Sequence, residues 1–294
     1  MPRRALSATR AADVLNFLAA HPNQAFSYSQ LAQRLQVNLA STHNLLLALV
    51  ECGYLTRSAS DRTFSLGPAL VALGDAALRE NAAVEEARVH ARRIGRELGR
   101  ETLVLVRAGS DVLCIARAGP AQEPGRTARV GQRIPLMAPL ASVFVAWAPE
   151  DEIDRWLLRA GVPRREQRRQ RDLLRRVRER GFSVALEVAG RRQIGELLDE
   201  LAEQPHSQTL RSEMRDAIHE LGHAHFQLDE KSAKAHEVSS LTAPIFDSRG
   251  RVELALTLQV FERDLPSREI DALGARLVRA TRAIAKKASL VTRA

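Results

Sequence analysis

The order of local patterns in the first 66 residues constrains the fold more than any other feature of the chain. From Ala11, apolar residues recur three and four positions apart, and a turn sequence at 21–23 ends this first helix. Ser27 is placed to cap a second short helix, and a third helix is predicted over about 40–52. Three short amphipathic helices in one segment predict a small helical domain built around a common apolar core.

Two short alternating segments, 54–57 and 62–66, follow the third helix and predict a β-hairpin. Three helices followed by a hairpin is the order of a winged helix-turn-helix, in which the third helix enters the major groove of DNA. The polar first turns of that helix can reach base edges, and nearby arginines can meet phosphates. The predicted DNA contacts are Arg10, Ser41, Thr42, His43, Asn44, Arg57 and Arg62. The alternative is a helical adaptor domain that binds no DNA.

Residues 67–100 contain a long amphipathic connector. Apolar residues follow three-and-four spacing along it, with a weak point near Asn81. Such a helix can pack on the rest of the chain or pair with a second copy. Pairing would matter for DNA binding, because residues 1–66 hold six arginines against three acidic residues, a net charge of only +3. A dimer that spans two half-sites supplies the missing affinity.

Beyond residue 100 the pattern is mixed, with strands on both sides of helices. This order predicts an α+β sheet domain over 101–294. The predicted strands cover 102–106, 112–116, 182–187, 238–246 and 252–261. The predicted helices cover 139–148, 150–159, 164–180, 191–204, 208–221 and 267–288.

The composition excludes several classes of protein. With 45% hydrophobic and 27% charged residues the chain folds, and 4% aromatic residues leave little material for the base stacking of single-strand and RNA binders. We predict a cytoplasmic protein without membrane contact from three observations. The two cysteines, Cys52 and Cys114, lie far apart, the start of the sequence has no signal-peptide core, and no long apolar run occurs. Since no P-loop or dinucleotide glycine motif occurs, we expect no cofactor.

The net charge of +9 favours an anionic partner such as nucleic acid. It is weak evidence alone, because only four of the 44 basic residues are lysine, and genome base composition can produce such an arginine excess. The densest run, 164–180, holds nine arginines and three acidic residues. A solvated helix face is the usual interpretation of such a run, and a second contact with DNA or with another subunit is the alternative.

Several stretches, in their order and spacing, resemble the IclR-type bacterial transcriptional regulators over nearly the whole chain. They are Arg10-Ala-Ala-Asp-Val-Leu, LAQRLQVNLASTHNLLLALVECGYL, RTFSLG, VGQRIPL, RERGFSV, LTAPIFDSRGRVELALTL and the terminal helix. The resemblance implies a winged helix-turn-helix over 1–66, a linker and dimerisation helix over 67–100, and a GAF-like effector-binding domain over 101–294. It further implies a homodimer or tetramer.

The function implied by the resemblance is ligand-responsive, sequence-specific transcriptional regulation without catalysis, more often as a repressor than as an activator. The partners would be a double-stranded DNA operator and a small-molecule effector. By position, the implied effector contacts are Met137, Ala138, Ser240, Thr257 and Gln259, a mixed apolar and hydrogen-bonding set.

The chain departs from the usual pattern of the family at three places. Where the recognition helix of relatives has a basic residue, Ser-Thr and an Arg, this chain has Leu39, Ala40-Ser41 and Asn44. Where relatives have a Leu-His-Ala-Thr-Ala-like stretch, it has 136–140, so the mouth of the implied pocket is more apolar. About 190–236 is an inserted helical pair that relatives usually lack.

The insertion contains His219-Glu220-Leu-Gly-His223, which matches the H-E-x-x-H pattern of zinc hydrolases. A DNA-tethered zinc metallohydrolase is therefore an alternative function. Gly222 would end the helix and pull His223 away from the face of His219, and no spacing singles out a third ligand among His225, His236 and Glu237. We accordingly predict no metal site and no catalytic residue.

Overall fold

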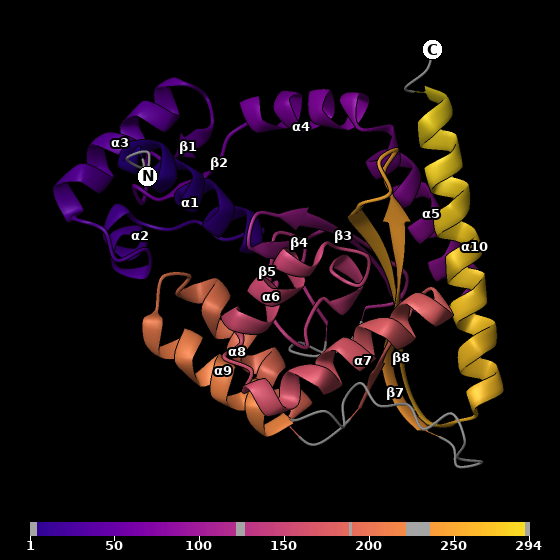
Figure 1. Cartoon of the computed structure of the whole chain (residues 1–294). Helices are drawn as coiled ribbons and strands as arrows, with labels where there is room; N and C mark the ends of the chain where they lie inside the picture. Colours follow the sequence, from indigo (N-terminus) through magenta and orange to yellow (C-terminus); the bar gives the residue numbers. More distant parts are fainter. Residues whose placement is uncertain (1–4, 122–126, 188–189, 222–235, 292–294) are drawn as a thin grey trace. The chain divides into compact units, whose positions relative to one another are not determined.

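The computed structural model describes residues 5–121, 127–187, 190–221 and 236–291. These form two compact units, one of Met1–Glu80 with Asp199–Arg211 and one of Asn81–Leu198 with Ser212–Ala294 (Figure 1). The division falls inside the predicted connector, and part of the predicted insertion belongs to the first unit. The architecture is mixed α+β, as predicted.

The first unit has the predicted order of three helices and a hairpin. Its elements are α1 (Leu6–Ala20), α2 (Tyr28–Arg34), α3 (Leu39–Glu51), β1 (Leu55–Arg57) and β2 (Phe64–Leu66). The Ser27 hydroxyl and the Gln30 side chain form a reciprocal capping box at the start of α2, which confirms the predicted cap. Strands β1 and β2 pair antiparallel, with Leu55 opposite Leu66.

A single apolar core holds these elements together. Leu31 of α2, Leu46 of α3, Leu55 of β1 and Phe64 of β2 are each no more than 1% exposed, and they belong to one cluster. Burying side chains of this size stabilises the fold by roughly 1.5–3 kcal/mol each. Helix α3 is therefore held in place by an apolar core that it shares with α2 and the hairpin.

The predicted connector is two helices, α4 (Ala69–Glu80) and α5 (Ala82–Leu98), and it breaks at the predicted weak point. The side chain of Asn81 accepts a hydrogen bond from the amide of Val84 at 3.2 Å and so starts a new helix. Helix α5 buries an apolar stripe in the second unit. Helix α4 has no buried residue, and Val71 and Leu73 are 74% and 51% exposed.

The second unit is built on a six-stranded antiparallel sheet in the order β5-β4-β3-β8-β7-β6. Its strands are β3 (Thr102–Ala108), β4 (Asp111–Ala118), β5 (Arg133–Pro135), β6 (Ser183–Leu186), β7 (His236–Phe246) and β8 (Val252–Leu265). Helix α10 (Ser267–Val291) packs on β7 and on α5, and α5 packs on β3 and β4. The two helices lie together along the sheet (Figure 1).

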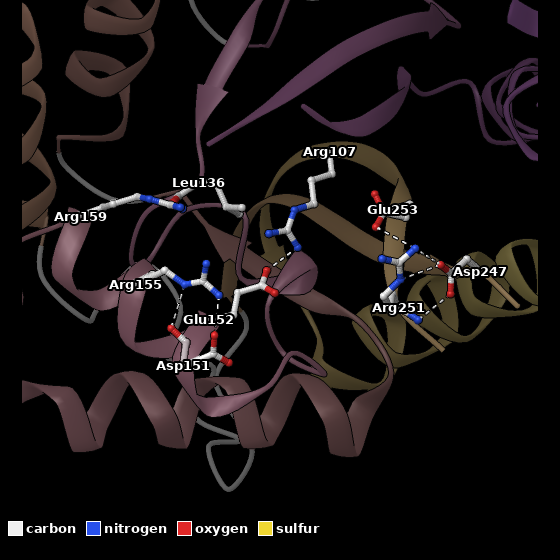
Figure 2. Close-up of polar contacts among 9 residues, drawn as sticks. All are labelled: Arg107, Leu136, Asp151, Glu152, Arg155, Arg159, Asp247, Arg251 and Glu253. Carbon is white, nitrogen blue, oxygen red and sulfur yellow. Dashed lines mark hydrogen bonds and ion pairs between the residues drawn. The ribbon is translucent and has the colours of Figure 1, made fainter. Parts of the chain in front are cut away.

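The segment between β5 and β6 contains the 3-10 turn η1 (Ser142–Phe144) and the helices α6 (Glu150–Arg159) and α7 (Arg164–Arg180). The predicted helix over 139–148 is wrong: Ala141 has a left-handed backbone with φ of 53°, which a regular helix cannot include, and only η1 remains. Two arginines connect α6 to its surroundings (Figure 2). Arg107 of β3 pairs with Glu152, and Arg159 donates to the carbonyl of Leu136 at 2.9 Å.

The inserted pair is α8 (Arg191–Glu203) and α9 (Gln208–Leu221). The turn between them contacts the helices of the first unit through charged groups. Glu203 accepts hydrogen bonds from the buried His21 ring and from Arg34, and the ring of His206 lies 3.1 Å from the Asp13 carboxylate. His21 also contacts the carbonyl of Phe17, at 2.6 Å. Glu203 is therefore the main polar contact of this segment inside the first unit.

We predict that Glu203→Ala lowers the free energy of unfolding by about 1–2 kcal/mol, because it leaves the buried ring of His21 without its carboxylate partner. Urea denaturation followed by circular dichroism measures the change. Glu200→Ala is the matched control, since Glu200 is exposed on the same helix and makes no side-chain contact among the described residues. The control should stay within about 0.5 kcal/mol of the parent. Equal effects of the two substitutions would contradict the prediction.

Candidate nucleic-acid interface and ligand site

The start of α3 is the candidate nucleic-acid interface. Asn38 caps this helix, with its side-chain oxygen accepting from the amides of Ala40 at 3.0 Å and Ser41 at 3.4 Å. Ser41 and Asn44 are exposed and lie about one turn apart, so both side chains are available on one face. A serine and an asparagine there can each donate and accept hydrogen bonds at base edges.

Thr42 and His43, the two predicted contacts between Ser41 and Asn44, differ in accessibility. Thr42 is 1% exposed and its hydroxyl donates to the Asn38 carbonyl at 2.8 Å, so the expected DNA contact by Thr42 is not supported. The helix period turns this position toward the core while its neighbours face outward. His43 is half-buried, and its ring meets the ring of Tyr28 edge-on at 5.6 Å between centroids.

The predicted arginines lie on the hairpin and on α1. Arg57 and Arg62 are exposed, and neither has an ion pair within the residues that the structure describes. The Arg57 guanidinium lies 5.7 Å from the centre of the ring of Phe64, its cross-strand partner on β2. Arg10 is half-buried on α1. Free guanidinium groups at a hairpin tip suit phosphate contacts.

A group of polar side chains on β7 and β8 is the candidate ligand site. Ser240 lies opposite Gln259, and Thr242 lies opposite Thr257, with their hydroxyls 2.9 Å apart. Because residues two apart in a strand share a face, these four side chains lie together, and we call them the polar quartet. The structure thus brings together three predicted residues, and it adds Thr242. The two-residue alternation after Ser240 was the available signal for Thr242.

The quartet continues onto β3 and β4 through Gln259. The Gln259 amide donates to the Glu101 carbonyl at 2.8 Å, and its side-chain nitrogen donates to the hydroxyl of Thr127 at 3.1 Å. Glu101 is 2% exposed and accepts from Arg117 at 2.7 Å. Sequence reasoning missed Glu101 and Arg117, because their place beside Gln259 depends on strand register.

Met137 and Ala138 lie in the loop after β5, and both are buried. The amide of Ala138 donates to the carbonyl of Trp156 at 3.2 Å, and the Trp156 indole donates to the Leu140 carbonyl at 2.9 Å. Helix α6 thereby holds this loop. The polar contacts of the described residues do not link Met137 or Ala138 to the quartet.

The sequence of residues 7–59 matches the family described as the IclR helix-turn-helix domain. The N-terminal unit contains an IclR helix-turn-helix domain. Its matched part includes the capped helix α3 and ends just after β1. No curated protein sequence gives a significant match to the chain.

The whole chain is similar to solved structures of IclR regulators. An IclR transcriptional regulator from Alicyclobacillus acidocaldarius has 21% identity and a TM-score of 0.66, over 98% of this chain and 99% of that one. HmgR of Pseudomonas aeruginosa has 23% identity and a TM-score of 0.60, over 96% and 99%. An IclR homolog from Microbacterium hydrocarbonoxydans, complexed with 4-hydroxybenzoate, has 18% identity and a TM-score of 0.61, over 97% and 99%. The IclR helix-turn-helix domain is thus followed by the C-terminal fold of these regulators.

Cys114 of β4 lies near the Glu101–Arg117 pair and is fully buried. Burial raises the pKa of its thiol to about 12. Cys114 is therefore a protonated, apolar part of the interior at neutral pH, and it offers no nucleophile.

The zinc-hydrolase pattern of the insertion lies mostly outside the described residues. Helix α9 ends at Leu221, Glu220 is exposed, and nothing is described of the His219 side chain or of His223 and His225. Among the residues that the structure does describe, no group of three His, Cys, Asp or Glu is arranged to hold a metal ion. In the same residues, no helix is long and apolar enough to cross a membrane.

Proposed function

We propose that this chain is a ligand-responsive, sequence-specific transcriptional repressor without catalytic activity. The exposed polar start of the capped helix α3, inside an IclR helix-turn-helix domain, carries the proposal. Ser41 and Asn44 would contact base edges, with His43 beside them. Arg10, Arg57 and Arg62 would contact phosphates, which position the domain but carry no sequence information.

The proposed effector site is the polar quartet, with Met137 and Ala138 as its apolar boundary. Thr257 and Gln259 are 5% and 4% exposed, so the quartet can offer hydrogen bonds away from bulk water. The binding of 4-hydroxybenzoate by the homolog from Microbacterium hydrocarbonoxydans supports a small molecule as the effector. This chain's own effector would be a small molecule that combines polar and apolar groups.

Regulation would follow from linkage between the two kinds of site. An effector that binds one arrangement of the C-terminal domains more tightly shifts the population toward that arrangement. In a dimer the spacing of two recognition helices would change with it, and operator affinity would change as a consequence.

A second copy of this chain is the proposed partner of helix α4. Leu70, Leu73 and Ala77 follow helical spacing, yet none is buried, whereas the ion pair between Asp75 and Arg79 marks the other side of the helix. An apolar helix face of this kind packs well against its own copy. A homodimer, alone or paired into a tetramer, would cover it.

We predict different effects of base-contact and phosphate-contact substitutions on DNA binding by the purified chain. Ser41→Ala and Asn44→Ala should reduce the preference for a fragment upstream of its own gene over scrambled DNA, by about 1–3 kcal/mol per contact. Arg57→Gln and Arg62→Gln should weaken both duplexes alike and lower the salt dependence by about one per substitution. Fluorescence anisotropy measures each affinity, with Glu51→Gln at the far end of α3 as control. If the parent showed no salt-sensitive binding to DNA, the proposed function as a transcriptional regulator would be refuted.

The quartet should control the response to effector and leave DNA binding intact. We expect at least one member of a panel of hydroxylated aromatics, small acids and apolar metabolites, starting with 4-hydroxybenzoate, to raise the melting temperature and release the upstream fragment. Thr242→Val with Thr257→Val should abolish both responses, because it removes two hydroxyls with little change of shape. Thr281→Val is the matched control, since the hydroxyl of this buried threonine of α10 donates to the carbonyl of Val278 in its own helix. An unchanged response in the double variant would place the effector elsewhere.

Charge placed on the apolar face of α4 should prevent association. Leu70→Glu and Leu73→Glu are expected to give monomers in analytical ultracentrifugation and to lower operator affinity at least tenfold, because a monomer meets one half-site only. Ala72→Glu adds the same charge at an exposed position on the side of Asp75 and Arg79, and it should keep the parent's mass. Monomers in all three variants, or in none, would refute pairing through this face.

A further inference from the structure

Helix α7 carries charge that the proposed DNA-binding domain does not explain. Residues 1–66 account for +3 of the net charge of +9, and α7 accounts for +6 through nine arginines and three carboxylates. The rest of the chain therefore has no net charge. A genome rich in arginine codons raises the number of arginines throughout a protein, but outside residues 1–66 and α7 the acidic residues equal the basic ones in number. The excess is concentrated on one helix.

The C-terminal half of α7 uses its arginines within the fold. Arg171 pairs with two carboxylates of α6, and Arg175 pairs with two carboxylates of its own helix. Arg178 donates to the carbonyl of Ala146 at 2.7 Å. These side chains have structural partners.

The N-terminal half of α7 differs. Arg164, Arg165, Arg168 and Arg169 are exposed and follow the spacing of one helix face, which we call the arginine face. In the described part of the chain, Arg164, Arg168 and Arg169 have no ion pair or hydrogen bond. Arg165 lies 3.6 Å from its neighbour Glu166 and its side chain remains 84% exposed.

This arrangement costs stability in the isolated chain. Positive charges near the N-terminus of a helix oppose its macrodipole, and like charges four residues apart repel each other. Both effects act on the arginine face, and no carboxylate among the described residues offsets them at Arg164, Arg168 or Arg169. Local features that work against the fold are typical of surfaces that serve a partner.

We propose that the arginine face is a second, sequence-independent contact for the phosphate backbone of DNA. This rests on the proposed function, which supplies the DNA. A guanidinium group binds phosphate in a bidentate manner, through two parallel hydrogen bonds. A row of such groups can therefore contact successive phosphates of a DNA strand. A lipid surface fits less well, because Leu174 and Val177, apolar side chains of α7, are buried in the fold and cannot enter a membrane.

The test compares Arg168→Gln/Arg169→Gln with the parent in the full chain, using the upstream fragment and a scrambled duplex across a range of salt concentrations. We expect both affinities to fall about tenfold or more at about 100 mM salt, with the salt slope lower by about two, one for each lost phosphate contact. Arg249→Gln/Arg282→Gln removes the same charge from exposed arginines whose side chains have no partner among the described residues, and it should change neither quantity by more than twofold.

Two further variants separate this contact from folding and from the helix-turn-helix. Arg168→Lys/Arg169→Lys keeps the charge and should bind within about threefold of the parent, and the glutamine pair should melt no lower than the parent because it removes repulsion. When Arg168→Gln/Arg169→Gln is combined with Arg57→Gln, the fold losses of DNA affinity should multiply.

Affinity and salt slope equal to those of the parent, or a loss matched by the Arg249→Gln/Arg282→Gln control, would overturn the arginine face as a DNA contact while leaving the regulator in place. A change in sedimenting mass with DNA binding unaltered would also overturn it, by identifying a contact between copies. Failure of the parent to bind either duplex would instead refute the proposed function.

Discussion

Strand β8 is the element on which the second unit depends. It pairs with β3 along one edge and with β7 along the other, so the register of both neighbours is set through it. One face of this three-stranded centre presents Thr242, Thr257 and Gln259, and Glu101 enters beside them from the residue before β3. A shift of β8 by one residue would turn Thr257 and Gln259 to the other face, away from Thr242 and Glu101. The candidate ligand site therefore exists only because two long antiparallel ladders hold their register.

Local periodicity was sufficient to predict most elements of the chain. The helix over 164–180 and the break near Asn81 were predicted because amphipathic spacing and a capping side chain act over a few residues. The same reasoning failed at 139–148, where the composition favours a helix but the backbone at Ala141 is left-handed. It also failed to find β5, a three-residue strand that hydrogen-bonding to β4 alone defines. Elements that depend on tertiary contacts leave little signal in their own residues.

Candidate sites were predictable to the extent that they follow one element. Ser41 and Asn44 were identified from the polar turn of a single helix, yet Thr42 between them is buried, because the spacing of polar residues did not match the helix period. The sequence pattern did not identify Glu101 and Arg117, because they come from two different parts of the sheet. Likewise, nothing in the sequence of the insertion indicated that Glu203 would meet His21 in the first unit.

The charges beside the quartet bear on which effector the proposed site would accept. Arg117 is committed to Glu101, so the pair brings no net positive charge. Among the described residues, the second carboxylate oxygen of Glu101 and the side-chain oxygen of Gln259 are buried without a partner, and both can only accept. Leaving such an atom unsatisfied costs about 1–3 kcal/mol. A ligand group that donates hydrogen bonds would recover that cost, whereas a bare carboxylate would leave both oxygens unsatisfied and add a second negative charge beside Glu101. On the proposed function, this face therefore selects hydroxyl- or amine-bearing effectors over simple acids.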